Sequence, residues 1–216
     1  MKKEEILEDL KKKIITGELH QGETLTEREI SETYGISRTP VREILWNLCS
    51  VNLAEQDPDK GCRVKTYTIN DMIEVYNTRE AIESACVRLA CLSKNPNFEK
   101  EIDQMIANLE SVTAVDDLET AVKYGVAVHQ FIRRECNNKY LLAFLNNIED
   151  VTTLLNYFAH KSSEIEEVSR VGHINILKAL KKRDQAESAK AMAEHIATTC
   201  QGIVRLQCAS LLLRTW

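Results

Sequence analysis

The sequence predicts a mainly α-helical protein, with short helices and a small β-hairpin at the N-terminus and a bundle of about six helices after them. Two observations on composition support this. The 216 residues include only three prolines and seven glycines, and 6% are aromatic, which favours helix over sheet. The hydrophobic content of 44% is ample for one large domain or two modest ones. A third observation is that apolar residues recur at helical spacing along most of the chain.

The first helix is expected over residues 3 to 16. Its apolar residues follow one another at spacings of three and four, which is typical of an amphipathic helix. They are Ile6, Leu7, Leu10, Ile14 and Ile15. Gly17 is positioned to end this helix, because glycine readily adopts the backbone conformation of a helix C-terminus.

Two further short helices are expected, joined by a tight turn. Thr26 and Glu29 have the spacing of a capping box, which predicts the start of the second helix. Gly35 tolerates a positive φ in the turn, and Ser37 is a candidate cap for a third helix running to Leu48. Pro40 falls in the first turn of that helix, where its missing amide hydrogen costs no intrahelical bond. The pattern is that of a helix-turn-helix.

A β-hairpin is expected after the third helix. Residues 54 to 65 contain two short extended runs around a turn at Pro58 to Gly61, as in the wing of a winged helix-turn-helix. From Ile69 onward the patterns are helical, which predicts an all-helical domain over 67–216 after a winged helix-turn-helix over 1–66, with the boundary near Tyr67. The expected helices cover residues 69–94, 97–113, 116–136, 139–161, 163–182 and 185–213.

Charge and cysteine content bound the function. The formal charge is −5, and the first 66 residues hold eleven Lys or Arg against thirteen Asp or Glu, so bulk charge gives no support to DNA binding. No apolar run is long enough to span a membrane, which predicts a cytoplasmic protein. Seven cysteines without CxxC pairing indicate reduced, mostly buried thiols. Cys62 in the wing is the one whose oxidation could disturb a DNA contact.

The start of the third helix has the residues that a DNA-reading helix needs. Arg38, Thr39 and Arg42 share one exposed face, while the opposite face carries apolar residues such as Ile44 and Leu48. A recognition helix presents its N-terminal residues to base edges in the major groove, and arginine pairs with guanine in a bidentate manner. The plainer alternative is that these arginines only solvate a helix surface.

The N-terminal region resembles the GntR family of winged-helix regulators. The resemblance covers the whole N-terminal domain and is carried by LTEREIS from Leu25, YGISRTPVRE from Tyr34 and the wing sequence KGCRV from Lys60. It implies contacts with double-stranded operator DNA, and the matching positions are Arg28, Arg38, Thr39, Arg42 and Gly61. For Arg28 an ion pair with Glu32 on the same helix face is the alternative.

The remainder of the chain resembles the FCD domain of the FadR subfamily. The matching features are YNTREAIE from Tyr76, three histidines, and a series of single residues. These are Asn138, Ile176, Ala179, Asp184 and Ala189. The resemblance implies a homodimer that binds a small organic-acid effector and thereby alters operator binding, and repression is the commoner behaviour in the family.

A metal site is implied by the same resemblance. Many FCD domains bind a divalent metal through an aspartate, a histidine four residues later and two histidines twenty-two residues apart. His129, His173 and His195 match the histidines, but Gly125 stands at the aspartate position. One account keeps one Zn²⁺ or Ni²⁺ per chain on the three imidazoles, with weakened affinity.

Two other accounts of the histidines stay open. In one, the metal is lost and the histidines, with Arg79 and Arg133, bind an anionic effector through charge-assisted hydrogen bonds. In the other, the histidines are ordinary core or surface residues. For Arg79 a salt bridge to Glu83 is the alternative role, and for Arg133 it is that of a solvated surface residue.

The sequence thus predicts a ligand-responsive DNA-binding transcription regulator, not an enzyme. A competing hypothesis is a metal-dependent hydrolase, because three histidines around zinc can activate water. It lacks an acidic residue at a spacing typical of a general base, and it leaves the DNA-reading motif without a purpose. A helical interaction scaffold without DNA binding is the third hypothesis, and the recognition-helix pattern argues against it.

Overall fold

The computed structural model describes residues 2–57 and 61–213. The chain divides into two compact units, one of residues 1–70 with 146–157 and one of residues 71–145 with 158–216. Residues 146–157 belong to helix α7 (Lys139–Ala159), so its middle is assigned to the first unit and its ends to the second.

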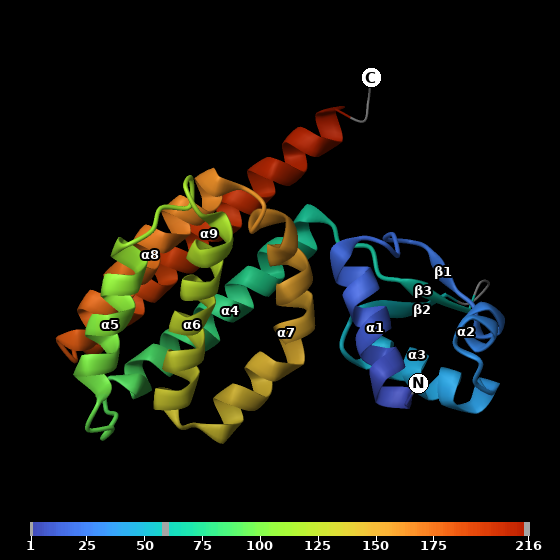
Figure 1. Cartoon of the computed structure of the whole chain (residues 1–216), viewed down its shortest axis with the longest axis horizontal. Coiled ribbons are helices and arrows are strands. Elements are labelled where there is room, and N and C mark those ends of the chain that lie inside the picture. Colours follow the sequence, from blue (N-terminus) through green and yellow to red (C-terminus); the bar gives the residue numbers. More distant parts are fainter. Residues whose placement is uncertain (1, 58–60, 214–216) are drawn as a thin grey trace. The chain divides into compact units, whose positions relative to one another are not determined.

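The first unit contains three short helices and a three-stranded sheet (Figure 1). The helices are α1 (Lys3–Thr16), α2 (Glu27–Tyr34) and α3 (Arg38–Ser50), and the strands are β1 (Thr24–Leu25), β2 (Ala54–Asp57) and β3 (Gly61–Val64). Strand β3 lies between the other two and is antiparallel to both. The helices and the hairpin strands were predicted, but the predicted turn falls partly on residues 58–60, which lie outside the described residues.

The ends of the helices follow their sequence signals, with one exception. The Thr26 hydroxyl accepts a hydrogen bond from the Glu29 amide, and Gly17 and Gly35 adopt positive φ values at the ends of α1 and α2. Ser37 occupies the N-cap position of α3, but its side chain makes no capping bond. An N-cap side chain usually accepts from the second or third helical amide, and the third position here is Pro40, which has no amide hydrogen.

The core of the first unit forms between α1, α3 and the sheet. Helix α3 buries one stripe of apolar side chains, and α1 contributes residues from the face that the periodicity predicted. The fully buried members are Ile6, Val41, Ile44, Leu48, Leu53 and Val64. Because this stripe fixes the rotation of α3, its opposite face points to solvent.

The second unit is helical throughout its described part. Its helices are α4 (Ile69–Ala90), α5 (Phe98–Glu110), α6 (Leu118–Cys136), α7 (Lys139–Ala159), α8 (Ser163–Lys181) and α9 (Gln185–Leu213). These six match the predicted helices, although α4 ends at Ala90 rather than near residue 94. Helices α8 and α9 are adjacent in sequence and pack most extensively, and α8 also contacts α5 and α6 (Figure 1). This packing brings α6, α8 and α9 together in the interior.

Candidate functional sites

The N-terminal turn of α3 forms an exposed polar surface on the first unit. Arg38 and Thr39 are its first two residues and Arg42 lies one turn later, and all three are exposed. They lie away from the stripe that contains Val41 and Ile44, both fully buried. The structure therefore presents these side chains as a recognition helix would.

Two of the arginines predicted to contact DNA are engaged in ion pairs. Arg42 Nε lies 2.7 Å from Glu27 Oε1 of α2, and Arg28 Nε lies 2.9 Å from Glu32 Oε1 within α2. The alternative considered for Arg28 is thus the arrangement found. Arg38 makes no ion pair or side-chain hydrogen bond with any residue in 2–57 or 61–213. An exposed pair contributes little to stability, so these arginines can exchange partners at low cost.

The exposed face of α3 has two further members, Glu43 and Trp46, which were not predicted from the sequence. Glu43 forms an ion pair with Lys3 of α1, with 2.8 Å between Lys3 Nζ and Glu43 Oε2, and this pair offsets the negative charge of Glu43. Trp46 leaves 68% of its surface exposed, and at 100° per residue it points almost in the same direction as Thr39. A large exposed aromatic residue is unusual on a monomer surface, and that exposure could not be distinguished from packing by sequence alone.

The wing supplies a glycine and a buried thiol. Gly61 begins β3 with a φ of 80°, and among the described residues no atom lies within 4 Å of a Cβ added there, so a backbone can approach it closely. Cys62 is buried with its Sγ 3.7 Å from Cys49 Sγ, and burial, together with Cys49, raises its pKa to about 12. A raised pKa disfavours the reactive thiolate, which argues against the oxidation of Cys62 considered above.

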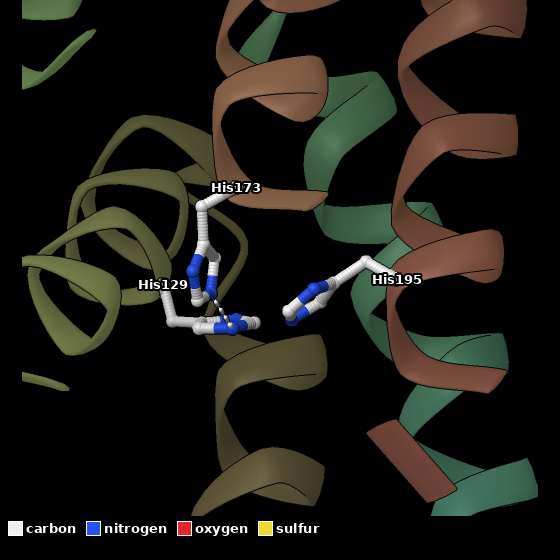
Figure 2. Close-up of side chains that lie close together, drawn as sticks. All are labelled: His129, His173 and His195. Carbon is white, nitrogen blue, oxygen red and sulfur yellow. Dashed lines mark hydrogen bonds between the residues drawn. The ribbon is translucent and has the colours of Figure 1, made fainter. Parts of the chain in front are cut away.

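The three histidines of the second unit converge from three helices. His129 lies on α6, His173 on α8 and His195 on α9, and Figure 2 shows their rings pointing into one space. His129 Nε2 and His173 Nε2 are 3.1 Å apart, and one nitrogen of each ring lies within 4.8 Å of the others. The spacing in sequence thus becomes a cluster in space.

Two of the three rings in the cluster are buried, and burial disfavours their charged form. His173 and His195 are 4% and 6% exposed. Burial lowers the pKa of His195 to about 3 and that of His173 well below its ordinary value, and the neighbouring histidines add to both shifts. The Nδ1 atoms of both rings are buried without a hydrogen-bond partner among the described residues. Unsatisfied buried nitrogens of this kind call for a ligand, an ion or water.

A buried glutamate on α4 joins the cluster. Glu83 Oε2 lies 2.6 Å from His129 Nδ1, and Glu83 Oε1 accepts a hydrogen bond from Arg79 Nε at 2.9 Å. Burial opposes ionisation of this carboxyl, but Arg79 and His129 together hold its pKa well below the ordinary value. From the sequence, Glu83 was predicted only as an alternative partner of Arg79, because its contact with His129 spans 46 residues.

The space beside Gly125 is filled by His173. A Cβ atom added to Gly125 would lie 2.7 Å from Cε1 and 3.0 Å from Nδ1 of the His173 ring. Gly172 has the same relation to His195, whose Nδ1 would lie 2.7 Å from an added Cβ. Real Cβ contacts are longer than this, so two histidine rings pack directly against helix backbone at glycines.

The predicted effector residues occupy different surroundings. Arg79 is buried and, besides bonding Glu83, lies with its guanidinium 5.0 Å from the Tyr76 ring centroid. The salt bridge to Glu83 that was the alternative role for Arg79 is therefore present. Arg133 is half-buried and follows His129 by one turn on α6, so it is not a fully solvated residue.

The donor set was compared with the needs of a divalent metal. Two nitrogens that bind one zinc at about 2.0–2.1 Å cannot be more than about 4.2 Å apart. The 3.1 Å between His129 and His173 meets this limit, and one nitrogen of His195 lies within 4.8 Å of a nitrogen of each of them, close to the same limit. The unpartnered buried nitrogens agree with such a ligand. The residues present therefore fit a metal held by three imidazoles.

Membrane association was tested on the helices of the described region. None of them combines the length and the apolar character that a membrane span requires.

Comparison with known proteins assigns both parts of the chain to described families. The model of "Bacterial regulatory proteins, gntR family" matches residues 2–64, and the model of the "FCD domain" matches residues 74–198. The Gluconate operon transcriptional repressor of Bacillus licheniformis is 24% identical over 205 residues, covering 87% of this chain and 79% of the relative.

Solved structures have the same fold. McbR/YncC of Escherichia coli aligns with a TM-score of 0.66 at 22% identity over 99% of this chain and 98% of its own. A transcriptional regulator GntR from Rhodococcus sp. RHA1 aligns with a TM-score of 0.71 at 17% identity, covering 93% of this chain and 96% of its own. At these identities the structures support the winged helix-turn-helix followed by a helical domain, and the regulators among the relatives argue against the hydrolase hypothesis.

Proposed function

Because the chain belongs to the GntR family of bacterial regulatory proteins and carries an FCD domain, it is a transcription regulator, and we propose that it is a dimeric, effector-responsive repressor. The observation that best supports DNA binding is the exposed N-terminal turn of α3, where Arg38, Thr39 and Arg42 are directed away from the core. DNA is its partner, so we place its action in the cytoplasm.

Arg38 can contact DNA without first breaking an ion pair, because it has no such partner among the described residues. Arg42 and Arg28 follow by exchanging Glu27 and Glu32 for guanine edges or phosphates, which costs little because both pairs are exposed. Gly61 lets the wing backbone approach the adjacent sugar-phosphate backbone. Phosphate contacts then fix the register, and base contacts provide specificity.

Effector binding is assigned to the second unit. His129, His173 and His195 would hold one divalent metal, Zn²⁺ or Ni²⁺, which supplies a Lewis-acidic centre for a carboxylate of the effector. Arg133, half-buried on α6, would bind a second acidic group, and Arg79 would add positive charge from α4. One relative is named for an operon of gluconate, which is a hydroxycarboxylate of this kind.

The two units would communicate through a boundary near Tyr67, with residues 1–66 as the reader and 67–216 as the effector-binding and dimerisation domain. In a two-fold dimer the operator has two half-sites whose spacing matches the separation of the reading helices. Effector binding releases the operator by changing that separation.

The test of DNA reading is binding to DNA from the protein's own promoter region across a range of salt concentrations. We expect salt-dependent binding to a palindromic site, and loss of it in the Arg38→Glu/Arg42→Glu variant. Arg205→Glu/Lys123→Glu is the matched control, because it changes net charge equally at exposed positions on α9 and α6. A monomer in light scattering, or equal operator affinity in both variants, would contradict the proposal.

The test of the metal is elemental analysis of untagged protein. About one zinc or nickel per chain, absent from His173→Ala/His195→Ala, supports the three-histidine site. No metal in either sample leaves only direct anion binding by the histidines, Arg79 and Arg133. In that case carboxylates would still shift the melting temperature of the metal-free protein.

A further inference from the structure

The buried glutamate of α4 completes the charge of the proposed metal site. We infer that Glu83, acting through His129, supplies the negative charge that the family pattern places at position 125, and that Gly125 is needed to admit the His173 ring. This inference rests on the proposed metal site. It assigns Glu83 as a positioning residue and assigns Gly125 to the shape of the site.

The contact between Glu83 and His129 sets the tautomer of the imidazole. An ionised carboxylate can only accept a hydrogen bond, so Nδ1 of His129, 2.6 Å from Glu83 Oε2, is the nitrogen that donates its hydrogen. The nitrogen left to bind a metal would be Nε2, which faces His173 Nε2 at 3.1 Å. A carboxylate in this relation fixes the ring of a metal-bound histidine and makes its nitrogen a stronger ligand.

Glu83 is itself held in place from the other side. Its Oε1 accepts from Arg79 Nε, and both side chains are almost fully buried, at 7% and 5% exposure. Glu83 therefore has no freedom to rotate towards solvent, and its two oxygens are divided between the guanidinium and the imidazole. The negative charge that position 125 lacks is thus supplied by Glu83 on α4, which contacts the proposed ligand His129 and would not bind the metal itself.

Gly125 is explained by the same geometry. Any side chain at this position would begin 2.7 Å from the His173 ring, so an aspartate could return only if that ring moved. Because α6 offers no side chain here, His173 can lie against the helix and reach His129. The glycine is therefore a condition for the position that the His173 ring takes in this chain.

The arrangement also selects the class of cation. Three imidazoles and no carboxylate form the donor cluster found in residues 2–57 and 61–213. Imidazole ligands favour zinc, nickel and related ions, whereas magnesium, calcium and manganese favour carboxylate oxygen. The site should consequently discriminate against manganese more strongly than a site with a direct aspartate ligand would.

The decisive experiment measures the zinc affinity of the full chain by competition with a chromophoric chelator. Glu83→Gln keeps an acceptor for His129 but removes the charge, and we expect zinc to bind about 10- to 100-fold more weakly. Glu80→Gln, a neighbour on α4 outside the cluster, is the matched control and should bind as the wild type does. Equal affinity in wild type and Glu83→Gln overturns the inference.

Two readouts separate positioning from a merely structural role. The visible spectrum of bound Co²⁺ should change in Glu83→Gln, because the orientation of one imidazole changes. If Glu83→Gln does not fold, the neutral pair Arg79→Gln/Glu83→Gln removes both buried charges together, and it should show the same loss of zinc affinity. A folded double variant with wild-type affinity and spectrum overturns the inference.

The role of Gly125 is tested with two glycine-to-alanine substitutions, both within helices. Gly125→Ala should weaken zinc binding at least tenfold, because its Cβ displaces the His173 ring. Gly202→Ala on α9 gains the same helix propensity, but its Cβ would meet only the flexible side chain of Ile165 at 3.2 Å or more, so zinc binding should be unchanged. Equal zinc affinity in the two variants would overturn the role of Gly125.

The outcomes also distinguish the inference from the proposed function. If the wild type binds no zinc, nickel or cobalt, the metal part of the proposed function fails and the inference fails with it. If the wild type binds zinc but neither Glu83→Gln nor Gly125→Ala changes the affinity, only the inference fails. DNA binding by Arg38 and Arg42 is independent of both results.

Discussion

Two Arg–Glu ion pairs with the same spacing, one in each unit, differ in their exposure to solvent. Arg28–Glu32 on α2 and Arg79–Glu83 on α4 both join residues four apart, and in both the Nε to Oε1 distance is 2.9 Å. The side chains of the first pair are 76% and 65% exposed, whereas those of the second are 7% and 5% exposed. Geometry alone therefore does not define the role of an Arg–Glu pair, and burial does.

The difference follows from solvation. Water screens the exposed pair, so each partner can separate at little cost and Arg28 is free to turn towards DNA. The buried pair has no water to replace a lost partner, so breaking it leaves an uncompensated charge. The Arg28–Glu32 pair of the first unit is thus exchangeable, while the Arg79–Glu83 pair of the second unit is fixed.

The largest expected effect comes from breaking the buried pair. Arg79→Ala should lower the free energy of unfolding by about 3–5 kcal/mol, because Glu83 loses its cation in the interior. Arg28→Ala should leave the free energy of unfolding nearly unchanged. Urea denaturation of the two variants measures both, and similar losses in the two would refute the contrast.

The next effect concerns operator affinity. Arg38→Ala should weaken specific binding by about 5- to 150-fold, because a bidentate contact with guanine is lost. Arg28→Ala should weaken it less, since phosphate contacts are individually smaller. Fluorescence anisotropy with a labelled operator measures both, and loss of specificity at one base pair in Arg38→Ala alone would identify the base it reads.

Acid should weaken the second unit through its histidines. His195 has a folded pKa of about 3, below the unfolded value of about 6.5, so the unfolded chain takes up a proton that the folded chain does not. Stability is therefore lost as the pH falls from about 6.5 towards 3, by about 1.4 kcal/mol per pH unit from this group.

His173 acts in the same direction, because its pKa is also lowered by burial. Urea denaturation of chelator-treated protein at several pH values should show this slope. His195→Gln should reduce it, and an unchanged slope in that variant would assign the acid sensitivity to other groups.

The smallest effect tests the exchangeable charges of the reader. Glu27→Gln removes the partner of Arg42 and should raise operator affinity by about two- to fivefold. Glu18→Gln, an exposed acidic residue after α1, corrects for the general loss of negative charge. Affinity gains that are equal in the two variants would mean that the Arg42–Glu27 pair does not compete with DNA.

The fold was largely predictable because local signals agreed with one another. Helical periodicity, the Thr26 cap and the glycines at positions 17 and 35 all act over a few residues, and each has its expected structural effect. Ser37 fails as a side-chain cap because Pro40 removes one of the amides it would bind. Helix α4 ends at Ala90, before the predicted end near residue 94, and Pro96 is a local signal against helix that the prediction did not use.

The site was predictable only in part. The spacing of the three histidines placed them together, but the Glu83–His129 contact joins α4 to α6 and has no sequence signature. Gly125 suggested a lost metal ligand, because the sequence shows that a side chain is missing at this position. The sequence does not show that the His173 ring fills the space beside it. Interactions between distant helices were therefore the part that needed the structure.

The exposed indole of Trp46 has a practical consequence for spectroscopy. The chain has two tryptophans, so Trp216→Phe leaves Trp46 as its sole long-wavelength emitter. Trp46 is 68% exposed and lies on the exposed face of α3. When DNA covers this face, Trp46 emission should shift to shorter wavelength and become less sensitive to acrylamide quenching. The protein would then report occupancy of its own reading helix optically, without an attached dye.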